Sequence, residues 1–312
     1  MIKEAIILAG GLGTRLKDAV PDKPKSMAPV AGLPFLSYVI RHLLSQGIRH
    51  IVFSLGYKHE MIEDFLKRNY GYLNYSVVIE KFPLGTGGAI MLALGKTTDR
   101  DILIVNGDTL YKVDVDDLND HHIENQSDCT LALKPMLGFD RYGAVEIGDH
   151  GRITKFQEKK LTKSGNINGG VYLLNKNHFI NRKFPEVFSF EKDYLEAYIG
   201  PSLLHGVIQE KYFVDIGIPQ DYEKVQIELA YPVMDFTLID QSWTLFLDRD
   251  GVINVNKDES YVFTKDEFQF IPGVNEAIAS LSKVFGKIII ITNQRGIGKG
   301  LMDELALNEI HQ

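Results

Sequence analysis

The sequence predicts an α/β protein built on a mostly parallel sheet, and three observations support this. Short apolar runs alternate with amphipathic stretches over residues 5–105, which is the pattern of strand–helix units in parallel sheets. Glycine-rich or acidic turns follow three of the expected strands. The 312 residues are 45% hydrophobic and 24% charged, an ordinary globular composition with enough chain for one large domain or two.

The composition also excludes several classes of protein. A net charge of -7 argues against a nucleic-acid or membrane-surface partner. No apolar run approaches the ~20 residues of a membrane span, and the charged start at residues 1–4 does not resemble a signal peptide, so we expect a cytoplasmic protein. Cys129 is the only cysteine, which excludes an internal disulfide, and its apolar neighbours predict a buried strand position.

The first expected strand, residues 5–9, leads into a glycine-rich turn and then into basic residues. The glycines are Gly10, Gly11 and Gly13, and the basic residues are Arg15, Lys23 and Lys25. Glycines permit positive φ and close backbone approach, and the N–H groups of such a turn can converge on an anion. We interpret residues 8–25 as a nucleotide-phosphate cradle; the alternative is a glycine turn with solvated basic residues. The run fits neither the Walker A motif nor the dinucleotide fingerprint.

The next segments alternate between helical and strand patterns. The expected helices cover residues 34–46, 58–69 and 88–94, and the expected strands cover residues 48–55, 75–79 and 101–105. Ligands of parallel sheets bind beyond the carboxyl ends of the strands. The loops after Leu8, Ile79 and Val105 should therefore meet at one crevice.

The loop over residues 80–89 contains a proline and three glycines, which could fix the backbone where a flat ligand lies against it. Its first residue, Glu80, has an acceptor-only carboxylate. Such a group can take two parallel hydrogen bonds from the N1–H and N2–H of guanine, and it suits uracil poorly. The alternative is a solvated glutamate at the end of a strand.

Two aspartates follow apolar strands, Asp108 in NGD and Asp215 in VDIGIP. An aspartate in this position is often only a turn former. Two of them could hold one Mg2+ between them, because Mg2+ binds through one or two carboxylates plus phosphates and waters.

From residue 128 to 174 the pattern is rich in strands, expected over residues 129–133, 142–147, 152–156 and 170–174. These strands could extend the sheet or form a side layer that holds a second substrate. Glu158, Lys159 and Asn168 lie beside them and offer groups suited to sugar hydroxyls and a phosphate. The acidic stretch over residues 111–125 lacks the pattern of a calcium loop, and we interpret it as an exposed helix face.

A domain boundary is expected between Leu229 and Trp243, where the strand–helix alternation breaks. The strand that follows delivers Asp248 and Asp250, and after an expected helix over residues 274–285 a strand over residues 287–291 leads to Thr292. Paired aspartates and a downstream hydroxyl at strand ends suit phosphoryl transfer through a carboxylate nucleophile.

Residues 1 to about 230 resemble the sugar-1-phosphate nucleotidyltransferases. The motifs occur in order: LAGGLGTRL, the KPK that ends at Lys25, PLGTGGA, NGD, FQEK, NGGVY and VDIGIP. SFEKDYL at residues 189–195 and RYGAVEI at residues 141–147 are most similar to the branch that joins GTP to D-glycero-D-manno-heptose 1-phosphate. The resemblance implies a Rossmann-like, mostly parallel mixed sheet, the GT-A-like nucleotidyltransferase fold, with Mg2+ as cofactor.

The resemblance also implies roles for individual residues. Lys25 and Arg15 would be catalytic, and Asp108 and Asp215 would hold the metal. The implied nucleotide-binding residues are Leu8, Ala9, Gly10, Gly11, Gly13, Thr14, Glu80, Pro83, Gly85 and Thr86. The implied sugar-phosphate-binding residues are Gly143, Glu158, Lys159, Asn168 and Gly169. The usual EKP triplet is Glu158-Lys159-Lys160 here, which leaves Lys159 in place.

Residues 243–312 resemble the start of the haloacid-dehalogenase phosphatases through FLDRDGVIN and TNQRGIGKG. The similar branch acts on D-glycero-D-manno-heptose 1,7-bisphosphate or histidinol phosphate. It implies Asp248 and Asp250 as catalytic residues, Asp248 also as a metal ligand, and Thr292 and Asn293 as phosphate-binding residues. The later Lys and metal-binding Asp of that family would lie beyond Gln312. We therefore expect a shortened two-enzyme fusion whose phosphatase part is inactive.

Together these patterns predict a transferase domain over residues 1–230, a linker over 231–242 and an incomplete phosphatase-like domain over 243–312. The expected reaction joins a nucleoside triphosphate, with GTP favoured, to a sugar 1-phosphate, with the heptose favoured, and releases pyrophosphate. Mannose 1-phosphate or another sugar 1-phosphate with UTP stays open, as does a homo-oligomer. The rivals are a phosphatase and a regulatory or scaffolding protein that binds nucleotide sugars without turnover.

Overall fold

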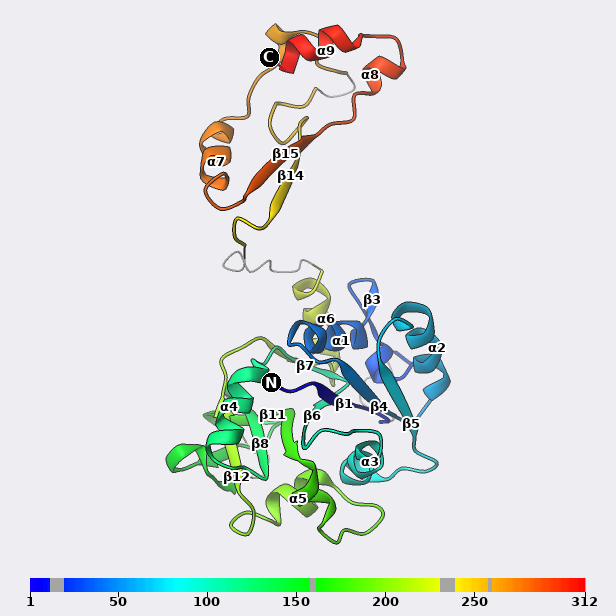
Figure 1. Cartoon of the computed structure of the whole chain (residues 1–312), viewed down its shortest axis with the longest axis vertical. Coiled ribbons are helices and arrows are strands. Elements are labelled where there is room, and N and C mark those ends of the chain that lie inside the picture. The colour runs from blue at the N-terminus through cyan, green and yellow to red at the C-terminus, as the bar shows by residue number, and fades with distance from the viewer. Residues whose placement is uncertain (12–19, 158–160, 231–238, 258–259, 312) are drawn as a thin grey trace. The chain divides into compact units, whose positions relative to one another are not determined.

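The computed structural model describes residues 1–11, 20–157, 161–230, 239–257 and 260–311. The chain divides into two compact units, Met1–Pro232 and Val233–Gln312, and each is described by itself (Figure 1). Among the described residues, no helix is both long enough and apolar enough to cross a bilayer.

The N-terminal unit is organised around a seven-stranded sheet with the order β12-β8-β11-β6-β1-β4-β5. Its strands are β1 (Glu4–Ala9), β4 (His50–Leu55), β5 (Tyr75–Ile79), β6 (Asp101–Asn106), β8 (Cys129–Phe139), β11 (Thr162–Asn175) and β12 (Leu204–Ile208). Strands β6, β1, β4 and β5 run parallel. Strand β11 is antiparallel to both β6 and β8, and β12 is parallel to β8. The sheet is therefore mostly parallel and mixed, as expected.

Three smaller sheets and several helices complete this unit. The paired strands are β2 (Pro29–Val30) with β3 (Leu33–Pro34), β7 (Thr109–Tyr111) with β13 (Phe213–Asp215), and β9 (Val145–Ile147) with β10 (Ile153–Phe156). The helices are α1 (Phe35–Ser45), α2 (His59–Tyr70), α3 (Gly85–Leu94), α4 (Val115–Glu124), α5 (Lys176–Ile180), α6 (Pro219–Glu228), the 3-10 turns η2 (Lys25–Met27) and η3 (Asp149–Gly151), and the π-helix η4 (Phe190–Glu196).

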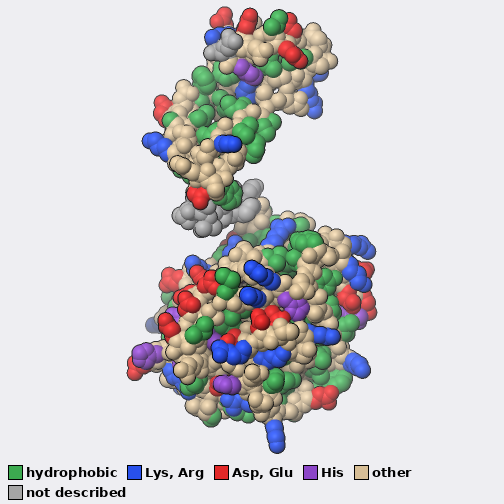
Figure 2. All heavy atoms as spheres, viewed as in Figure 1, with side chains coloured by type: hydrophobic (Ala, Val, Ile, Leu, Met, Phe, Trp, Pro, Cys, Tyr) green, Lys and Arg blue, Asp and Glu red, His purple; other side chains and the backbone are tan. Residues whose placement is uncertain are grey.

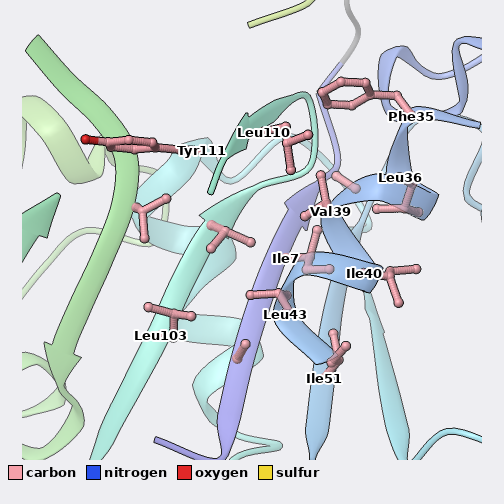
Figure 3. Packing of buried hydrophobic residues seen from close by; sticks show 14 of the residues in the cluster. Ile7, Phe35, Leu36, Val39, Ile40, Leu43, Ile51, Leu103, Leu110 and Tyr111 are labelled. Carbon is pink, nitrogen blue, oxygen red and sulfur yellow. The ribbon is translucent and has the colours of Figure 1, made fainter. Parts of the chain in front are cut away.

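Apolar side chains alternate across β1, so that each face of the sheet has its own core. Ile7 lies on the face covered by α1, where Val39 and Leu43 pack against it (Figure 3). Ile6 lies on the opposite face, in a second cluster that includes Phe179 from α5. Full burial of such a side chain contributes about 1.5–3 kcal/mol. The two clusters hold the strand ends, and the loops that follow them, in fixed positions.

The structure corrects several of the expected element ends. Strand β8 continues to Phe139, and β11 begins at Thr162, so that both extend the main sheet, while β9 and β10 form a side layer. The strand-rich region was expected either to extend the sheet or to form a side layer. The first alternative is correct for β8 and β11, and the second is correct for β9 and β10. Cys129 is buried, as predicted.

The helix interpreted as an exposed face is only partly exposed. Helix α4 forms over Val115–Glu124, but His122 is 1% exposed and its Nδ1 lies 2.8 Å from Thr130 Oγ1. Leu118 is also buried on this helix. The i,i+4 spacing of these two residues is the signal that identifies the buried face.

The C-terminal unit contains β14 (Thr244–Asp248), η6 (Lys265–Glu267), α7 (Val274–Leu281), β15 (Lys287–Ile291), α8 (Arg295–Gly298) and α9 (Glu304–His311). Strands β14 and β15 form a two-stranded parallel sheet. Phe246 is 58% exposed and Ile290 is 53% exposed, and Figure 2 shows apolar side chains gathered on the visible face of this unit. The buried apolar side chains among its described residues are Ile239, Ile253, Val262 and Ile310. Few of the described apolar side chains of this unit are therefore buried.

Candidate active site

The loops after β1, β5 and β6 meet at one edge of the sheet. The N–H of Gly107 donates to the carbonyl of Leu8 at 2.8 Å, which joins the loop after β6 to the end of β1. A Cβ added to Gly10 would lie 2.4 Å from Glu80 Oε1, so the loop after β1 contacts the residue that directly follows β5. The predicted convergence is confirmed for these residues, and a side chain at Gly10 would require the carboxylate of Glu80 to move.

Lys25 connects the two aspartates that the sequence singled out. Its Nζ donates to Asp108 Oδ2 at 2.6 Å and to Asp215 Oδ1 at 3.0 Å. Lys25 begins η2, Asp108 follows β6, and Asp215 ends β13, which pairs with β7 beside Asp108. The side chain of Lys25 is 14% exposed, and those of Asp108 and Asp215 are 37% and 25% exposed. The structure thus brings three separate segments together around one ammonium group.

Asp215 is held in place by two further donors. The N–H of Gly217 donates to its Oδ1 at 2.8 Å, and the hydroxyl of Tyr142 lies 3.4 Å from its Oδ2. Burial and the charge of Asp215 both raise the pKa of Tyr142, so the phenol stays protonated as a donor. Arg141 pairs with Asp221 at 2.8 Å beside this group.

Tyr142 and Arg141 were not among the predicted site residues. Both lie directly before Gly143 in RYGAVEI, so the sequence signal was present in that motif. Gly143 itself contacts the carbonyl of Gln157, which would lie 2.5 Å from an added Cβ.

The donor set at Asp108 and Asp215 fits a divalent cation. Each carboxylate has oxygen lone pairs directed at the position that Lys25 Nζ holds, so a positive charge is already accommodated there. Mg2+ requires only one or two carboxylates when phosphates and waters supply its other ligands. Three-residue clusters of metal-binding side chains do not occur in the described part of the chain, so a dedicated all-protein metal cage is not formed by those residues.

Glu80 is half-buried, and one of its oxygens is engaged within its own loop. Its Oε2 accepts a hydrogen bond from the N–H of Leu84 at 3.0 Å. Burial raises the pKa of the Glu80 carboxyl, and the bond from Leu84 opposes part of that shift. Oε1 faces Gly10. A two-point contact with guanine would therefore use Oε1 together with Oε2, which already accepts from the N–H of Leu84.

The glycines after Pro83 pack against the chain around Phe188, and the interpretation of residues 80–89 as a surface for a flat ligand stays a prediction. Helix α3 begins at Gly85 rather than at Gly88. A Cβ on Gly85 would lie 2.4 Å from the carbonyl oxygen of Phe188, and one on Gly87 would lie 2.2 Å from the Phe188 ring. Thr86 Oγ1 donates to Glu191 Oε2 at 2.7 Å. The chain around Phe188 therefore covers Gly87, while Pro83 and Gly85 remain exposed.

Asn168 and Gly169 lie where the pairing of β11 with β8 changes register, between Asn168 and Tyr172. Asn168 Oδ1 accepts from the N–H of Gly170 at 3.0 Å, and its Nδ2 donates to the Tyr172 hydroxyl at 2.9 Å. Gly169 packs against the ring of Tyr111. Such irregularities are common next to active sites, where they redirect side chains.

Five predicted site residues lie outside the described residues. They are Gly13, Thr14, Arg15, Glu158 and Lys159. Their roles remain predictions. Leu8, Ala9 and Gly11, also predicted to bind the nucleotide, lie at the end of β1 and in the turn after it.

The predicted phosphatase residues come together at the ends of β14 and β15. Gln294 Nε2 donates to Asp250 Oδ2 at 2.9 Å and to Thr292 Oγ1 at 2.6 Å. Burial acts to raise the pKa of Asp250, but hydrogen bonds from Arg249, Asn254 and Gln294 hold that pKa below its ordinary value.

The other two predicted phosphatase residues are exposed. Asp248 accepts from the N–H of Arg249 at 2.7 Å, and Asn293 lies beside Thr292. A cavity of about 600 Å³ next to them is lined by Arg249, Phe268, Ile290 and Thr292, among others.

The fold and the Lys25–Asp108–Asp215 site of the N-terminal unit define an α/β transferase that works on a phosphorylated nucleotide. A sequence model of the family described as nucleotidyl transferase matches residues 4–231. The chain belongs to this family, and it is an enzyme of the sugar-1-phosphate nucleotidyltransferase class.

Two relatives with the same description and one solved structure are similar to this chain over nearly their full length. The D-glycero-alpha-D-manno-heptose 1-phosphate guanylyltransferase of Aneurinibacillus thermoaerophilus is 49% identical over 228 residues, which is 73% of this chain and 99% of the relative. The enzyme of the same description from Campylobacter jejuni is 42% identical over 219 residues, 70% of this chain and 96% of the relative. The crystal structure of HddC from Yersinia pseudotuberculosis complexed with GMP-PN aligns with a TM-score of 0.66 and 33% identity, covering 73% of this chain and 100% of that protein.

Proposed function

We propose that this protein transfers the guanylyl group of GTP to D-glycero-D-manno-heptose 1-phosphate and releases pyrophosphate. The observation that carries the proposal is the group formed by Lys25, Asp108 and Asp215 at the carboxyl edge of the sheet. The two similar enzymes from Aneurinibacillus and Campylobacter, which it matches over nearly their full length, support the choice of heptose and of guanine.

In the proposed reaction the phosphate oxygen of the sugar attacks the α-phosphorus of GTP in line, and pyrophosphate leaves from the opposite side. The oxygen–phosphorus bond that forms replaces the one that breaks, so the enzyme needs no covalent intermediate. Catalysis then consists of positioning and charge neutralisation. Lys25 supplies a positive charge for the α-phosphate, and Arg15 with the N–H groups after β1 holds the remaining phosphates.

Asp108 and Asp215 are the residues that would hold Mg2+. When bound, the ion would neutralise phosphate charge during transfer. Tyr142 and Gly217 orient Asp215 by donating to its two carboxylate oxygens. On the sugar side, we assign the phosphate to Lys159 and the hydroxyl groups to Glu158, Asn168 and the backbone near Gly143 and Gly169.

Glu80 is proposed to select the base. Its carboxylate lies against Gly10, where the nucleotide cradle begins, and it can accept hydrogen bonds from the N1–H and N2–H of guanine. Thr86 lies in the first turn of α3, which follows this loop, but its hydroxyl is already bonded to Glu191. We therefore assign Thr86 to nucleotide binding through its position beside the base rather than through its hydroxyl.

The test is magnesium-dependent release of pyrophosphate from the four common nucleoside triphosphates with a panel of sugar 1-phosphates. GTP with the heptose should give the highest kcat/KM, ahead of mannose 1-phosphate with GTP or UTP. Asp108→Asn and Lys25→Ala should each lower the rate about a hundredfold, the usual loss for one preorganised contact. Equal use of all four triphosphates would overturn the base assignment. Binding of nucleotide sugar without pyrophosphate release would indicate a scaffolding protein instead.

We further propose that residues 243–312 resemble part of a haloacid-dehalogenase phosphatase and are joined to the transferase by residues 231–242. The side-chain amide of Gln294 donates to both Asp250 and Thr292, which supports this proposal. These two bonds hold the expected acid/base carboxylate and the expected phosphate-binding hydroxyl close together. Orthophosphate release from D-glycero-D-manno-heptose 1,7-bisphosphate would show activity. Asp248→Asn, which removes the expected nucleophile, distinguishes activity of this chain from contamination.

A further inference from the structure

A polar cavity of about 470 Å³ is lined by β9, β10 and the first residues of β11. This volume is within the usual range for ligand pockets. We propose that the cavity binds the terminal diol of the heptose, the CHOH–CH2OH group where mannose has only CH2OH, and so selects the sugar. This inference rests on the proposed transferase function and assigns one part of its second substrate to side chains that have no role so far.

Two walls of the cavity continue segments to which the sugar is already assigned. Gln157 lines the cavity and directly precedes Glu158, and Asn166 lines it two residues before Asn168. The register between β11 and β8 is regular from Ser164 to Asn168. Residues two apart on a strand face the same way, and they are separated by about 7 Å. A sugar in contact with Asn168 is therefore within reach of Asn166.

A third wall begins close to the reacting centre. Ala144 lines the cavity, and the hydroxyl of Tyr142, two residues earlier, lies 3.4 Å from Asp215 Oδ2. A β-bridge between Ala144 and Ile167 holds this segment against β11. The chain that leaves the Lys25–Asp108–Asp215 site thus leads into the cavity. A sugar whose phosphate lies at that site can place its far end there.

The cavity contains hydrogen-bonding groups that the described residues do not use among themselves. Within the described part of the chain, the side chains of Ser164 and Asn166 have no hydrogen-bond partner. Glu146 Oε1 accepts from Gln157 Nε2, and the described residues supply no donor to its Oε2. The edge of β11 beside the cavity is also open, because β6 pairs with β11 only from Val171 onward.

These groups match a neutral polyol better than a phosphate. The described lining residues include one carboxylate, that of Glu146, and no Lys, Arg or His. A phosphate would need cations. A hydroxyl can donate to the carboxylate of Glu146, and it can either donate to or accept from the amide of Asn166. Two adjacent hydroxyls of a diol can use both groups. A site that bonds a hydroxyl discriminates strongly against an analogue that lacks it.

The first test measures kcat/KM with GTP for D-glycero-D-manno-heptose 1-phosphate and for mannose 1-phosphate. Asn166→Ala and Glu146→Ala should each lower the ratio of the two values about threefold to tenfold, the range for one hydrogen bond. The value for mannose 1-phosphate should not change. Asn69→Ala and Glu60→Ala, at exposed positions of α2, are the matched controls and should leave the ratio unaltered.

A structural role would give a different result. Equal losses with both sugar phosphates, or an unchanged ratio in both folded variants, would overturn the inference. Thermal unfolding shows whether each variant is folded. If Asn166→Ala is not, Glu146→Ala decides the comparison, because Glu146 is exposed in β9.

Calorimetry with the products tests the same contact without turnover. The wild-type protein should bind the GDP derivative of the heptose more tightly than GDP-mannose, and Glu146→Ala should reduce this difference while the affinity for GDP stays the same. Equal affinity of the wild-type protein for the two nucleotide sugars would overturn the inference. Failure to release pyrophosphate from GTP and the heptose phosphate would instead contradict the proposed function, and the calorimetric comparison would still decide the role of the cavity.

Discussion

The ammonium group of Lys25 lies 2.6 Å from Asp108 Oδ2, and this ion pair occupies the centre of the candidate active site. A second carboxylate, that of Asp215, accepts from the same ammonium at 3.0 Å. One positive charge thus faces two carboxylates that are partly shielded from water. A divalent cation placed between these carboxylates has to compete with Lys25, and bound phosphates give Lys25 an alternative partner.

Replacing Lys25 with Met should therefore have opposite effects on catalysis and on metal binding. Pyrophosphate release should fall about a hundredfold or more, because a charge at the α-phosphate is lost. The affinity of the nucleotide-free protein for Mn2+, measured by electron paramagnetic resonance, should rise because the competing ammonium is gone. Lys96→Met, at an exposed position in the same unit, is the control. An unchanged Mn2+ affinity would show that the metal does not bind between Asp108 and Asp215.

Tyr142→Phe tests whether the orientation of Asp215 contributes to the rate. The hydroxyl lies 3.4 Å from Asp215 Oδ2, a long contact for which about 0.5–1.5 kcal/mol is the expected range. That range corresponds to a loss of roughly twofold to tenfold in kcat/KM. Tyr72→Phe, at a tyrosine that is 77% exposed, should have no effect. A loss in Tyr142→Phe larger than that of Asp215→Asn would require a direct role for the phenol with substrate.

The sequence predicted the strand ends of this site better than it predicted the contacts among them. Asp108 and Asp215 could be identified because each follows an apolar run. The pairing of both with Lys25 could not, because it depends on how β7 and β13 pair across a long sequence separation. Tyr142 was missed for the same reason: its partner Asp215 is brought near only by the fold.

The glycines of PLGTGGA make a packing contact that the sequence pattern did not predict. Glycine-rich loops near strand ends suggest a ligand, but the close approach at Gly87 is made by the ring of Phe188, distant in the sequence. Phe188 is buried and stacks on Phe184 with ring centroids 4.4 Å apart. Sequence pattern alone cannot tell whether a ligand or another part of the chain needs the space at a glycine.

Gly87→Ala should destabilise the protein by about 1–3 kcal/mol, the usual cost of overpacking, because the new Cβ would lie 2.2 Å from the Phe188 ring. The measurement is the midpoint of urea unfolding. Combining the change with Phe188→Leu provides the control: if the ring causes the clash, the double variant should be more stable than the sum of the single losses predicts. If the double variant instead loses the sum of the two single losses in unfolding free energy, the assigned contact between position 87 and the Phe188 ring would be contradicted.

Glu80 gives the site a pH dependence whose direction follows from its raised pKa. Burial disfavours the ionised form, so the folded protein keeps the proton of Glu80 to higher pH than the unfolded chain does. Its contribution to stability therefore falls as pH rises through the interval between the unfolded and the folded pKa. Glu80→Gln should remove this part of the pH dependence.

The same titration should change base selection. As pH falls through the raised pKa, Glu80 gains a proton and loses acceptor capacity for the guanine N2–H. The ratio of kcat/KM for GTP to that for ITP, which lacks the 2-amino group, should therefore fall toward one at acid pH. Glu80→Gln should show a low ratio at every pH. If this ratio does not change with pH in the wild-type protein, Glu80 does not take part in recognition of the base.

Ending the chain after residue 230 should leave nucleotidyl transfer intact. The two hydrophobic clusters that hold the sheet are formed by residues 2–225, and the Aneurinibacillus relative aligns over 99% of its length with 73% of this chain. The removed unit exposes Phe246 and Ile290, so the shortened protein should also aggregate less on heating. Pyrophosphate release and light scattering measure the two effects. A large loss of activity in the folded, shortened protein would mean that residues 231–312 contribute to the transferase, and would contradict the proposed independence of the two domains.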